Sequence, residues 1–317
     1  MSSDLFNGLI VGNHGRHFIV ESTSGDRLIC HSRGKKSLGV VGDRVLWKPS
    51  EDEGTIEKIL DRQSLFYRQD EIRTKSFAAN LDQILILVAA RPEFSSSQLS
   101  RALIAAEAAK IRPLIVLNKS DLVDPFRRAW SWLQPYIAMG YEVLPLTLGE
   151  GTSIKAGTSP VNVELLHALT EQLQGRTTLI LGPSGAGKST LINHLIPGAL
   201  AQTGIISEAL NSGKHTTTST TWYWMDAQKT TALIDSPGFQ EFGLNHIEPA
   251  RLAAYMPDLR IHVDRCRFYN CTHLHEPNCA VIAAVGATDD GNSGRTISQN
   301  RYEIYQSLFA ELSQKRY

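Results

Sequence analysis

The chain has 317 residues, of which 42% are hydrophobic and 20% are charged. This length suits two or three domains, and the composition is that of a globular protein with ample material for a core. Lysines plus arginines equal aspartates plus glutamates at 32 each, so net charge alone does not favour a nucleic-acid partner. The longest apolar runs, such as residues 84–90, are too short to span a membrane, and the first residues lack the layout of a signal peptide. We therefore expect a cytoplasmic protein without membrane contact.

Residues 1–70 contain short β-rich segments separated by turns. A hairpin is expected across residues 8–20, because Asn13-His14-Gly15 divides that stretch into two β-rich halves. Further strands are expected at residues 27–30, 40–47 and 54–60. Short strands at this spacing suit a small closed barrel, for which an OB-fold is the best match and an SH3-like barrel is the alternative. Barrels of this kind commonly bind RNA on one face.

Residues 74–242 alternate between apolar strands and helical segments. Strands are expected at residues 81–88, 112–117, 141–146, 176–181 and 230–235, and helices at 97–110, 125–139, 161–173 and from 190 onward. This alternation indicates an α/β domain with a doubly wound parallel sheet.

A short motif, Asn118-Lys119-Ser120-Asp121, follows the expected strand at residues 112–117. It has the form N-K-x-D and lies at the carboxyl end of its strand, where open α/β sheets bind ligands. The Asp121 carboxylate can accept two hydrogen bonds from the N1 and N2 donors of guanine, whereas adenine lacks that pair of donors. The motif therefore predicts GTP rather than ATP. Thr147-Leu148-Gly149 occupies the position of a second base-binding loop, where many GTPases have Ser-Ala, so we expect that loop to be altered in detail.

The most specific motif consists of Gly182, Pro183, Ser184, Gly185, Ala186, Gly187, Lys188 and Ser189. It has the form G-x-x-x-x-G-K-S/T, in which glycines let backbone N–H groups approach phosphates, the lysine reaches the outer phosphates and the hydroxyl holds Mg²⁺. An apolar strand precedes it and Thr190 continues it into a helix, whose N-terminus favours anions. The sequence therefore predicts a phosphate loop. In an ordinary GTPase this loop precedes the guanine motif, so the reversed order here indicates circular permutation.

Two further segments follow the phosphate loop. The strand at residues 230–235 ends in D-x-P-G, in which Asp235 would hold the Mg²⁺ shell through water and the Gly238 N–H would meet the γ-phosphate. Residues 213–218, with the sequence G-K-H-T-T-T, occupy the position of the first switch, where one threonine would close onto Mg²⁺. We prefer Thr218 for this ligand, with Thr217 as the alternative.

The catalytic group is expected outside the D-x-P-G segment. Phe239 follows D-x-P-G, where many GTPases carry a glutamine that orients the attacking water. Because a phenylalanine cannot do this, the group has to come from elsewhere, and His215 in the first switch is the candidate within reach. The alternative is that His215 only contacts a partner, since an unperturbed imidazole suits several functions.

Three of the four cysteines gather near the C-terminus in the pattern Cys266-x4-Cys271-x-His273-x5-Cys279. Three thiolates and one imidazole form a closed tetrahedral set of the kind that binds structural Zn²⁺. A disulfide is disfavoured, because a nucleotide-dependent enzyme works in the reducing cytosol and an odd cluster leaves one thiol unpaired. Unligated thiols are the remaining alternative. Cys30 stands alone and is expected to be a small buried hydrophobe.

The segment 246–317 is polar, carries this cluster and ends in a helix expected over residues 298–314. One face of that helix would carry Tyr302, Tyr305, Leu308, Phe309 and Leu312, which is more typical of core packing than of stacking on RNA. The sequence therefore predicts an OB-like barrel at residues 1–70, a permuted α/β GTPase domain at 74–242 and a mostly α zinc-binding domain at 246–317.

With these parts in this order, the chain resembles the RsgA family of ribosome-small-subunit-dependent GTPases. The resemblance covers nearly the whole length, from the barrel through the permuted motifs to the C-x4-C-x-H-x5-C cluster. It implies a factor that binds the small subunit and its rRNA near the decoding region, acts late in assembly, and hydrolyses GTP slowly unless the subunit stimulates it. It also implies that His215 matches a switch histidine held to assist hydrolysis. We expect GTP or GDP with Mg²⁺, one Zn²⁺ per chain, and a monomer.

The permutation has a mechanical consequence that does not depend on the family. Asp235 and Gly238 lead within a few residues into the zinc-binding domain. A γ-phosphate that orders this second switch could therefore reposition that domain and turn hydrolysis into release from a partner. Two alternatives remain open: a GTP-dependent RNA-binding module whose hydrolysis is incidental, and a GTPase for another cytoplasmic partner whose barrel binds protein.

Overall fold

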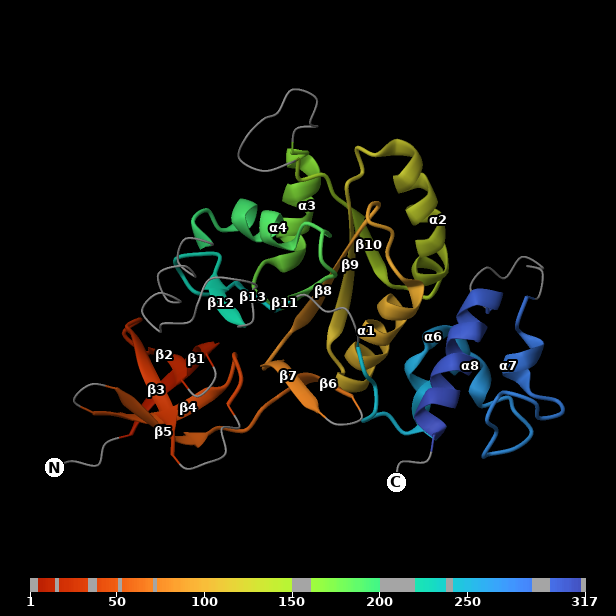
Figure 1. Ribbon diagram of the computed structural model, residues 1–317, viewed down its shortest axis with the longest axis horizontal. Helices are drawn as coiled ribbons and strands as arrows, with labels where there is room; N and C mark the ends of the chain where they lie inside the picture. Colours follow the sequence, from red (N-terminus) through yellow and green to blue (C-terminus); the bar gives the residue numbers. More distant parts are fainter. Residues whose placement is uncertain are drawn as a thin grey trace.

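The computed structural model describes residues 5–14, 17–33, 39–50, 53–70, 73–149, 161–199, 220–237, 242–286 and 297–314. Figure 1 shows three regions in a row: a small barrel in red, a central α/β domain, and a helical region in blue. The N-terminus lies at the barrel and the C-terminus beside the helical region. None of the helices in these ranges is both long enough and apolar enough to cross a bilayer.

The barrel consists of strands whose pairings close a ring. They are β1 (Phe6–His14), β2 (His17–Ser22), β3 (Arg27–Ser32), β4 (Arg44–Pro49) and β5 (Gly54–Ile59). β1 pairs with β2 and β4, β2 pairs with β3, and β5 lies between β3 and β4 with the β3–β5 pair parallel. This strand order is that of a Greek-key OB-fold. It therefore favours the OB-fold over the SH3-like alternative. Phe18, Trp47 and the lone Cys30 are buried inside, as expected for apolar side chains.

A β-hairpin that the sequence reasoning did not predict joins the barrel to the α/β domain. β6 (Leu65–Gln69) and β7 (Thr74–Ala79) form a two-stranded antiparallel sheet. Single bridges connect the hairpin to the barrel, from Ala78 to Val41, and to the segment after D-x-P-G, from Gln69 to Leu244. Each strand gathers its apolar residues at one end, in the sequences LFYRQ and TKSFAA, so little apolar alternation was available to predict them.

The central sheet has the spatial order β10-β9-β8-β11-β13-β12. Its strands are β8 (Gln83–Ala89), β9 (Arg112–Asn118), β10 (Glu142–Pro145), β11 (Thr177–Leu181), β12 (Thr221–Trp224) and β13 (Ala232–Asp235). All neighbouring pairs are parallel except β12–β13. β11, which carries the phosphate loop, lies between β8 and β13, although the chain reaches it only after β8, β9 and β10. The sheet is continuous in space, but the order of its strands along the chain is permuted.

Helices pack on this sheet close to where the sequence predicted them. They are α1 (Ser96–Ala109), α2 (Val123–Ala138), α3 (Val163–Leu173) and α4 (Lys188–Leu195). Ser95 caps the N-terminus of α1, because its side chain accepts a hydrogen bond from the Gln98 N–H, and Asn162 caps α3 in the same manner. β8 is buried along its whole length, which is why its apolar run was recognisable.

The C-terminal region is helical, with a short 3₁₀ helix, η1 (Pro249–Tyr255), followed by α6 (Pro257–Val263), α7 (Ala280–Ala283) and α8 (Gln299–Ser313). α8 confirms the predicted terminal helix. Tyr302, Tyr305, Leu308 and Leu312 are buried on it, so this face packs into the core.

The barrel and the central sheet are joined through β12. Gly12 of β1 pairs with Thr221 of β12, which makes the two sheets continuous. The buried Glu21 carboxylate of β2 accepts hydrogen bonds from Trp224 Nε1 at 2.9 Å and from Lys229 Nζ at 2.6 Å. The barrel is therefore fixed against the strand that follows the predicted first switch.

Candidate functional site

The carboxyl ends of four parallel strands meet at one edge of the central sheet. β8, β9, β11 and β13 end there at Ala89, Asn118, Leu181 and Asp235. The guanine motif, the phosphate loop and D-x-P-G all begin at these ends. Strand direction therefore gathers motifs that are far apart in the sequence, at the edge where open α/β sheets bind ligands.

The phosphate loop turns tightly between β11 and α4. Gly185 and Gly187 have positive φ angles of 80° and 100°, which favour glycine. A Cβ on Gly182 would lie 2.7 Å from the Leu87 carbonyl oxygen of β8, so this position also requires glycine. Lys188 is the first residue of α4, and Ser189 is exposed in its first turn. The loop thus combines a helix N-terminus with the hydroxyl of the motif, which is an arrangement suited to phosphate.

The guanine motif and the phosphate loop are in direct contact. Asn118 is 3% exposed and donates a hydrogen bond from Nδ2 to the Ala186 carbonyl oxygen at 2.9 Å. A Cβ on Gly187 would lie 2.4 Å from the same Nδ2, so the loop glycine makes room for the asparagine. Asn118 Oδ1 is buried and has no hydrogen-bond partner within the described ranges. Because an unpaired buried acceptor costs free energy, this oxygen is suited to receive a donor when a ligand or water binds.

Lys119 and Asp121 lie at the rim of the same edge. Lys119 has a φ of 67°, and its Nζ donates to the Arg91 carbonyl oxygen at 2.5 Å. Asp121 is exposed and so is accessible to a ligand. The sequence reasoning did not identify Arg91, because a residue that contributes its backbone carbonyl leaves no side-chain pattern.

The altered base-binding loop packs on the guanine motif. Thr147 Oγ1 is hydrogen-bonded to Ser120 Oγ, and the Ser120 N–H donates to the Leu146 carbonyl oxygen at 3.0 Å. The carbonyl oxygen of Leu148 lies 3.1 Å from Nε2 of His194 on α4. The loop is therefore where the sequence predicts it, with a threonine hydroxyl directed at the motif.

A buried ion pair occupies the centre of the site. Lys188 Nζ is bonded to Asp235 Oδ1, and the two side chains are 10% and 5% exposed. Burial raises the pKa of Asp235 above its ordinary value, and the charge of Lys188 opposes that rise. Ser236 beside it is fixed by a hydrogen bond to the Ile180 carbonyl oxygen at 2.8 Å. The two groups predicted to meet phosphate and the Mg²⁺ shell neutralise each other in this structure.

Five residues singled out from the sequence lie outside the described ranges: His215, Thr217, Thr218, Gly238 and Phe239. The roles assigned to them, which are a catalytic group, a Mg²⁺ ligand and a γ-phosphate contact, stay predictions from the sequence.

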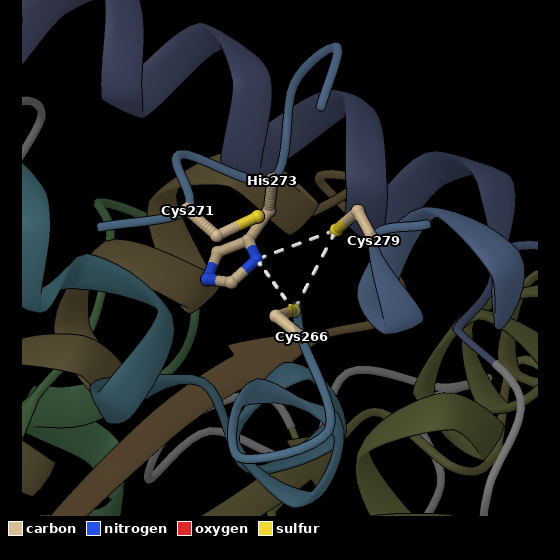
Figure 2. A group of neighbouring side chains, drawn as sticks. All are labelled: Cys266, Cys271, His273 and Cys279. Carbon is tan, nitrogen blue, oxygen red and sulfur yellow. Dashed lines mark hydrogen bonds between the residues drawn. The ribbon is translucent and has the colours of Figure 1, made fainter. Parts of the chain in front are cut away.

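The side chains of Cys266, Cys271, His273 and Cys279 converge in the C-terminal region (Figure 2). Their ligand atoms all lie within 4.8 Å of one another. Cys266 Sγ and Cys279 Sγ are 3.8 Å apart, and each is 3.5 Å from His273 Nδ1. With Zn–S bonds of about 2.3 Å and Zn–N bonds of about 2.0–2.1 Å, a tetrahedral ion requires S···S separations of about 3.8 Å and S···N separations of about 3.6 Å. The separations among Cys266, His273 and Cys279 therefore fit one tetrahedral metal ion, and Cys271 Sγ lies within 4.8 Å of all three ligand atoms.

The protonation chemistry of the cluster is also consistent with a metal. Burial raises the pKa of Cys271 to about 12 and raises the pKa of Cys279 above its ordinary value. Burial lowers the pKa of His273, which favours the neutral imidazole that a metal requires. In the absence of a cation the thiols are poor sources of thiolate, so a divalent ion is the group that would stabilise these buried ligands in their charged form.

Hydrogen bonds fix the loop that carries Cys271 and His273 of this candidate metal site. Tyr302 and Tyr305 of α8 donate their hydroxyl protons to the carbonyl oxygens of His273 at 2.8 Å and Thr272 at 2.7 Å. The Glu276 carboxylate accepts from the backbone N–H of Thr272 at 2.6 Å and from its hydroxyl at 2.5 Å. The sequence placed the tyrosines in the core but did not connect them with the ligand loop, because side-chain bonds to backbone carbonyls leave no spacing pattern.

Comparison with known proteins decides the family. The model of the RsgA GTPase family matches residues 59–245. A small ribosomal subunit biogenesis GTPase RsgA of Variovorax paradoxus (strain S110) is 64% identical over 313 residues, which cover 99% of this chain and 94% of that protein. The chain belongs to the RsgA GTPase family. A second relative with the same name, from Paraburkholderia phytofirmans, is 47% identical over 99% of this chain and 95% of its own length.

Solved structures related to this RsgA-family chain have the same fold. YjeQ from Thermotoga maritima superposes with a TM-score of 0.71 and 29% identity, covering 99% of this chain and all of that one (100%). YloQ, described as a circularly permuted GTPase, has a TM-score of 0.67 and 26% identity, covering 99% and 98%. The fold class and the enzyme class predicted from the sequence are confirmed: the chain is a circularly permuted GTPase that hydrolyses GTP, with an N-terminal barrel and a C-terminal cluster suited to one metal ion.

Proposed function

We propose that this GTPase binds the small ribosomal subunit and its rRNA, acts late in maturation of the subunit, and leaves it upon hydrolysis of GTP. The observation that carries the proposal is the 64% identity, over 99% of the chain, to a relative named a small ribosomal subunit biogenesis GTPase. This identity extends through the barrel and the C-terminal region, so it includes surfaces outside the nucleotide site.

In the proposed mechanism the guanine base is recognised by the N-K-x-D motif. The exposed carboxylate of Asp121 accepts from N1 and N2 of the base, which excludes adenine. Asn118 holds the motif against the phosphate loop through its bond to the Ala186 carbonyl oxygen. Backbone N–H groups of residues 184–190 would face the phosphates, and Lys188 would reach their outer oxygens.

The Lys188–Asp235 ion pair separates when nucleotide binds, because each group then has another partner. Lys188 would then reach the phosphates, and Asp235 would hold the Mg²⁺ shell through water. Ser189 and Thr218 would complete the protein ligands of Mg²⁺. The cation, when bound, offsets phosphate charge and polarises the γ-phosphoryl group.

We assign the positioning of the attacking water to His215 and the γ-phosphate contact to the Gly238 N–H. The argument for His215 is that Phe239 has no polar group to orient water. A histidine aligned only when the partner docks gives slow turnover of the free protein and fast turnover on the subunit.

The C-terminal cluster is proposed to hold one structural Zn²⁺, since its closed set of three thiolates and one imidazole leaves no open position for substrate. We propose that the barrel (1–70) and the zinc-binding domain (246–317) flank the GTPase domain (74–242), with the barrel contacting rRNA. The protein would act as a monomer in the cytoplasm.

Co-sedimentation with purified small subunits tests this proposal. Binding should be stronger with a non-hydrolysable GTP analogue than with GDP, and subunits should stimulate GTP turnover. Binding without any stimulation would favour a GTP-dependent module with incidental hydrolysis. Absence of binding at moderate salt would favour another cytoplasmic partner.

A further inference from the structure

The segment directly after the second switch is firmly held in this structure. Phe242 is buried, and its ring lies 5.6 Å from that of Phe66 and 6.0 Å from that of Phe77 on the β6–β7 hairpin. The Gly243 carbonyl oxygen accepts from the Gln69 N–H at 3.1 Å, and the Asn245 N–H donates back to the Gln69 carbonyl oxygen at 2.9 Å. Residues 242–245 therefore extend the hairpin like a third strand, and a displacement of this segment has to involve its neighbours.

One arginine of α1 connects this segment to the C-terminal helix. Arg101 Nη1 donates to the Phe242 carbonyl oxygen at 3.3 Å and to Glu311 Oε1 at 2.9 Å. Its second amino group is bonded to Glu311 Oε2, which makes the ion pair with α8 bidentate. The guanidinium is planar and its donors are fixed relative to one another. The position of the Phe242 carbonyl oxygen therefore influences how Arg101 can align with Glu311.

Two other arginines attach the same region to α1 through different contacts. Arg301 of α8 donates to both carboxylate oxygens of Asp258, at 2.8 and 3.0 Å, and to Ser100 Oγ at 2.7 Å. Arg260 of α6 donates to Glu107 at 3.4 Å. These contacts dock the C-terminal region on α1 and do not use residues 242–245, whereas Arg101 combines docking with a bond to Phe242 in the segment that follows the second switch.

We propose that Arg101 is a positioning residue that transmits the nucleotide state of the second switch to α8 and the metal-binding region. The proposal rests on the proposed function in one respect, namely that D-x-P-G responds to the γ-phosphate. A change in that motif displaces the Phe242 carbonyl oxygen and alters the shared Nη1 bond, which changes the alignment of Arg101 with Glu311. The stability of the α8 contact thereby depends on which nucleotide is bound.

Hydrogen exchange of the full-length protein with bound metal tests this coupling without ribosomes. In the wild type, exchange of α8 and α6 amides should differ between a non-hydrolysable GTP analogue and GDP by about fivefold or more, which is the lower end of typical coupling between sites. Arg101→Gln and Glu311→Gln should each reduce that difference to less than twofold. Both variants should keep the nucleotide-dependent protection of residues 182–189. Arg260→Gln is the matched control, because it removes an ion pair of the same interface and should behave as the wild type.

Three results would overturn the proposal: no nucleotide-dependent difference at α8 in the wild type, an unchanged difference in Arg101→Gln, or an equal reduction in the Arg260→Gln control. If Arg101→Gln loosens α8 completely with both nucleotides, the milder Glu311→Gln variant decides, because it keeps an oxygen acceptor for Arg101. Failure of the proposed function is distinguishable, since it would show as wild-type protein that does not bind small subunits or does not protect residues 182–189 with GTP.

Discussion

Replacing Asp235 with asparagine should destabilise the nucleotide-free protein far more than the GDP-bound protein. Asp235 and Lys188 are 5% and 10% exposed and form an ion pair with each other. Asparagine has nearly the same shape but no charge, so the Lys188 ammonium would stay buried without a counter-charge. Removing one partner of a buried ion pair costs about 3–5 kcal/mol. At about 2–4 °C per kcal/mol for a domain of this size, the melting temperature of the GTPase domain should fall by about 6–20 °C.

Saturating GDP should reduce this loss to less than half, because the phosphates give Lys188 another partner. Thermal unfolding of wild type and variant would be compared with and without GDP, in magnesium-free buffer so that Asp235 has no role in holding Mg²⁺. Hydrogen exchange of β11 and β13 would assign the loss to the correct domain. Asp124→Asn is the control, since Asp124 pairs with Arg127 at 83% and 78% exposure and a surface pair contributes only about 0–1 kcal/mol. An equal loss of melting temperature with and without GDP would refute the inference that Lys188 exchanges Asp235 for the phosphates.

Further predictions concern the base, the metal, the barrel and catalysis. Asp121→Asn should weaken binding of GTP and admit xanthine nucleotides, because an amide can donate to the xanthine O2; unchanged GTP affinity would remove the base-reading role. Cys266→Ala should abolish binding of about one zinc per chain, whereas Cys30→Ala should retain it, and zinc loss in the second variant alone would contradict the ligand set. Burial acts to raise the pKa of Glu21, but hydrogen bonds from Lys229, Trp224 and Arg27 outweigh it, so its pKa lies below the ordinary 4.5. The difference in unfolding free energy between wild type and Glu21→Gln should therefore have its full size above pH 4.5 and shrink as the pH falls through the lower pKa of the folded state. A constant difference over that pH range would show that the charge of Glu21 does not contribute to stability. His215→Ala should keep GTP affinity and subunit binding but lose most subunit-stimulated hydrolysis, and a loss of subunit binding would make it a contact residue.

The functional motifs could be predicted because their chemistry is local. A phosphate loop needs glycines where the backbone has positive φ, as at Gly185 and Gly187, and this requirement is visible in the sequence. The metal cluster needs donors within one short segment, and the Cys266–Cys279 spacing places them there. In both cases the site follows from residues that are neighbours in the chain, and strand direction then brings Asn118 to Ala186.

The contacts between regions could not be predicted, because they depend on pairs distant in the chain. Arg101 and Glu311 are ordinary charged residues on two helices, and only the packing of α8 on α1 makes them partners. The β6–β7 hairpin is stabilised by Phe66 and Phe77, which pack on Phe242. The sequence of neither strand alternates between apolar and polar residues, so it does not reveal this packing. Sequence reasoning therefore predicted the residues of each candidate site but not the contacts between the regions.

The permuted chain order gives each predicted switch a flanking domain as its direct neighbour. β12 follows the first switch and pairs with β1, so the barrel is attached at that point although it comes first in the sequence. Residues 242–245 follow D-x-P-G and lead into η1 and the region of the Cys/His cluster, so the second switch is joined to that region through the chain itself. In an unpermuted chain, further strands of the same sheet would follow the second switch and separate it from any C-terminal domain. Cutting the fold before β8 removes that separation, and a displacement of either switch then acts on a flanking domain through a single strand or a short segment.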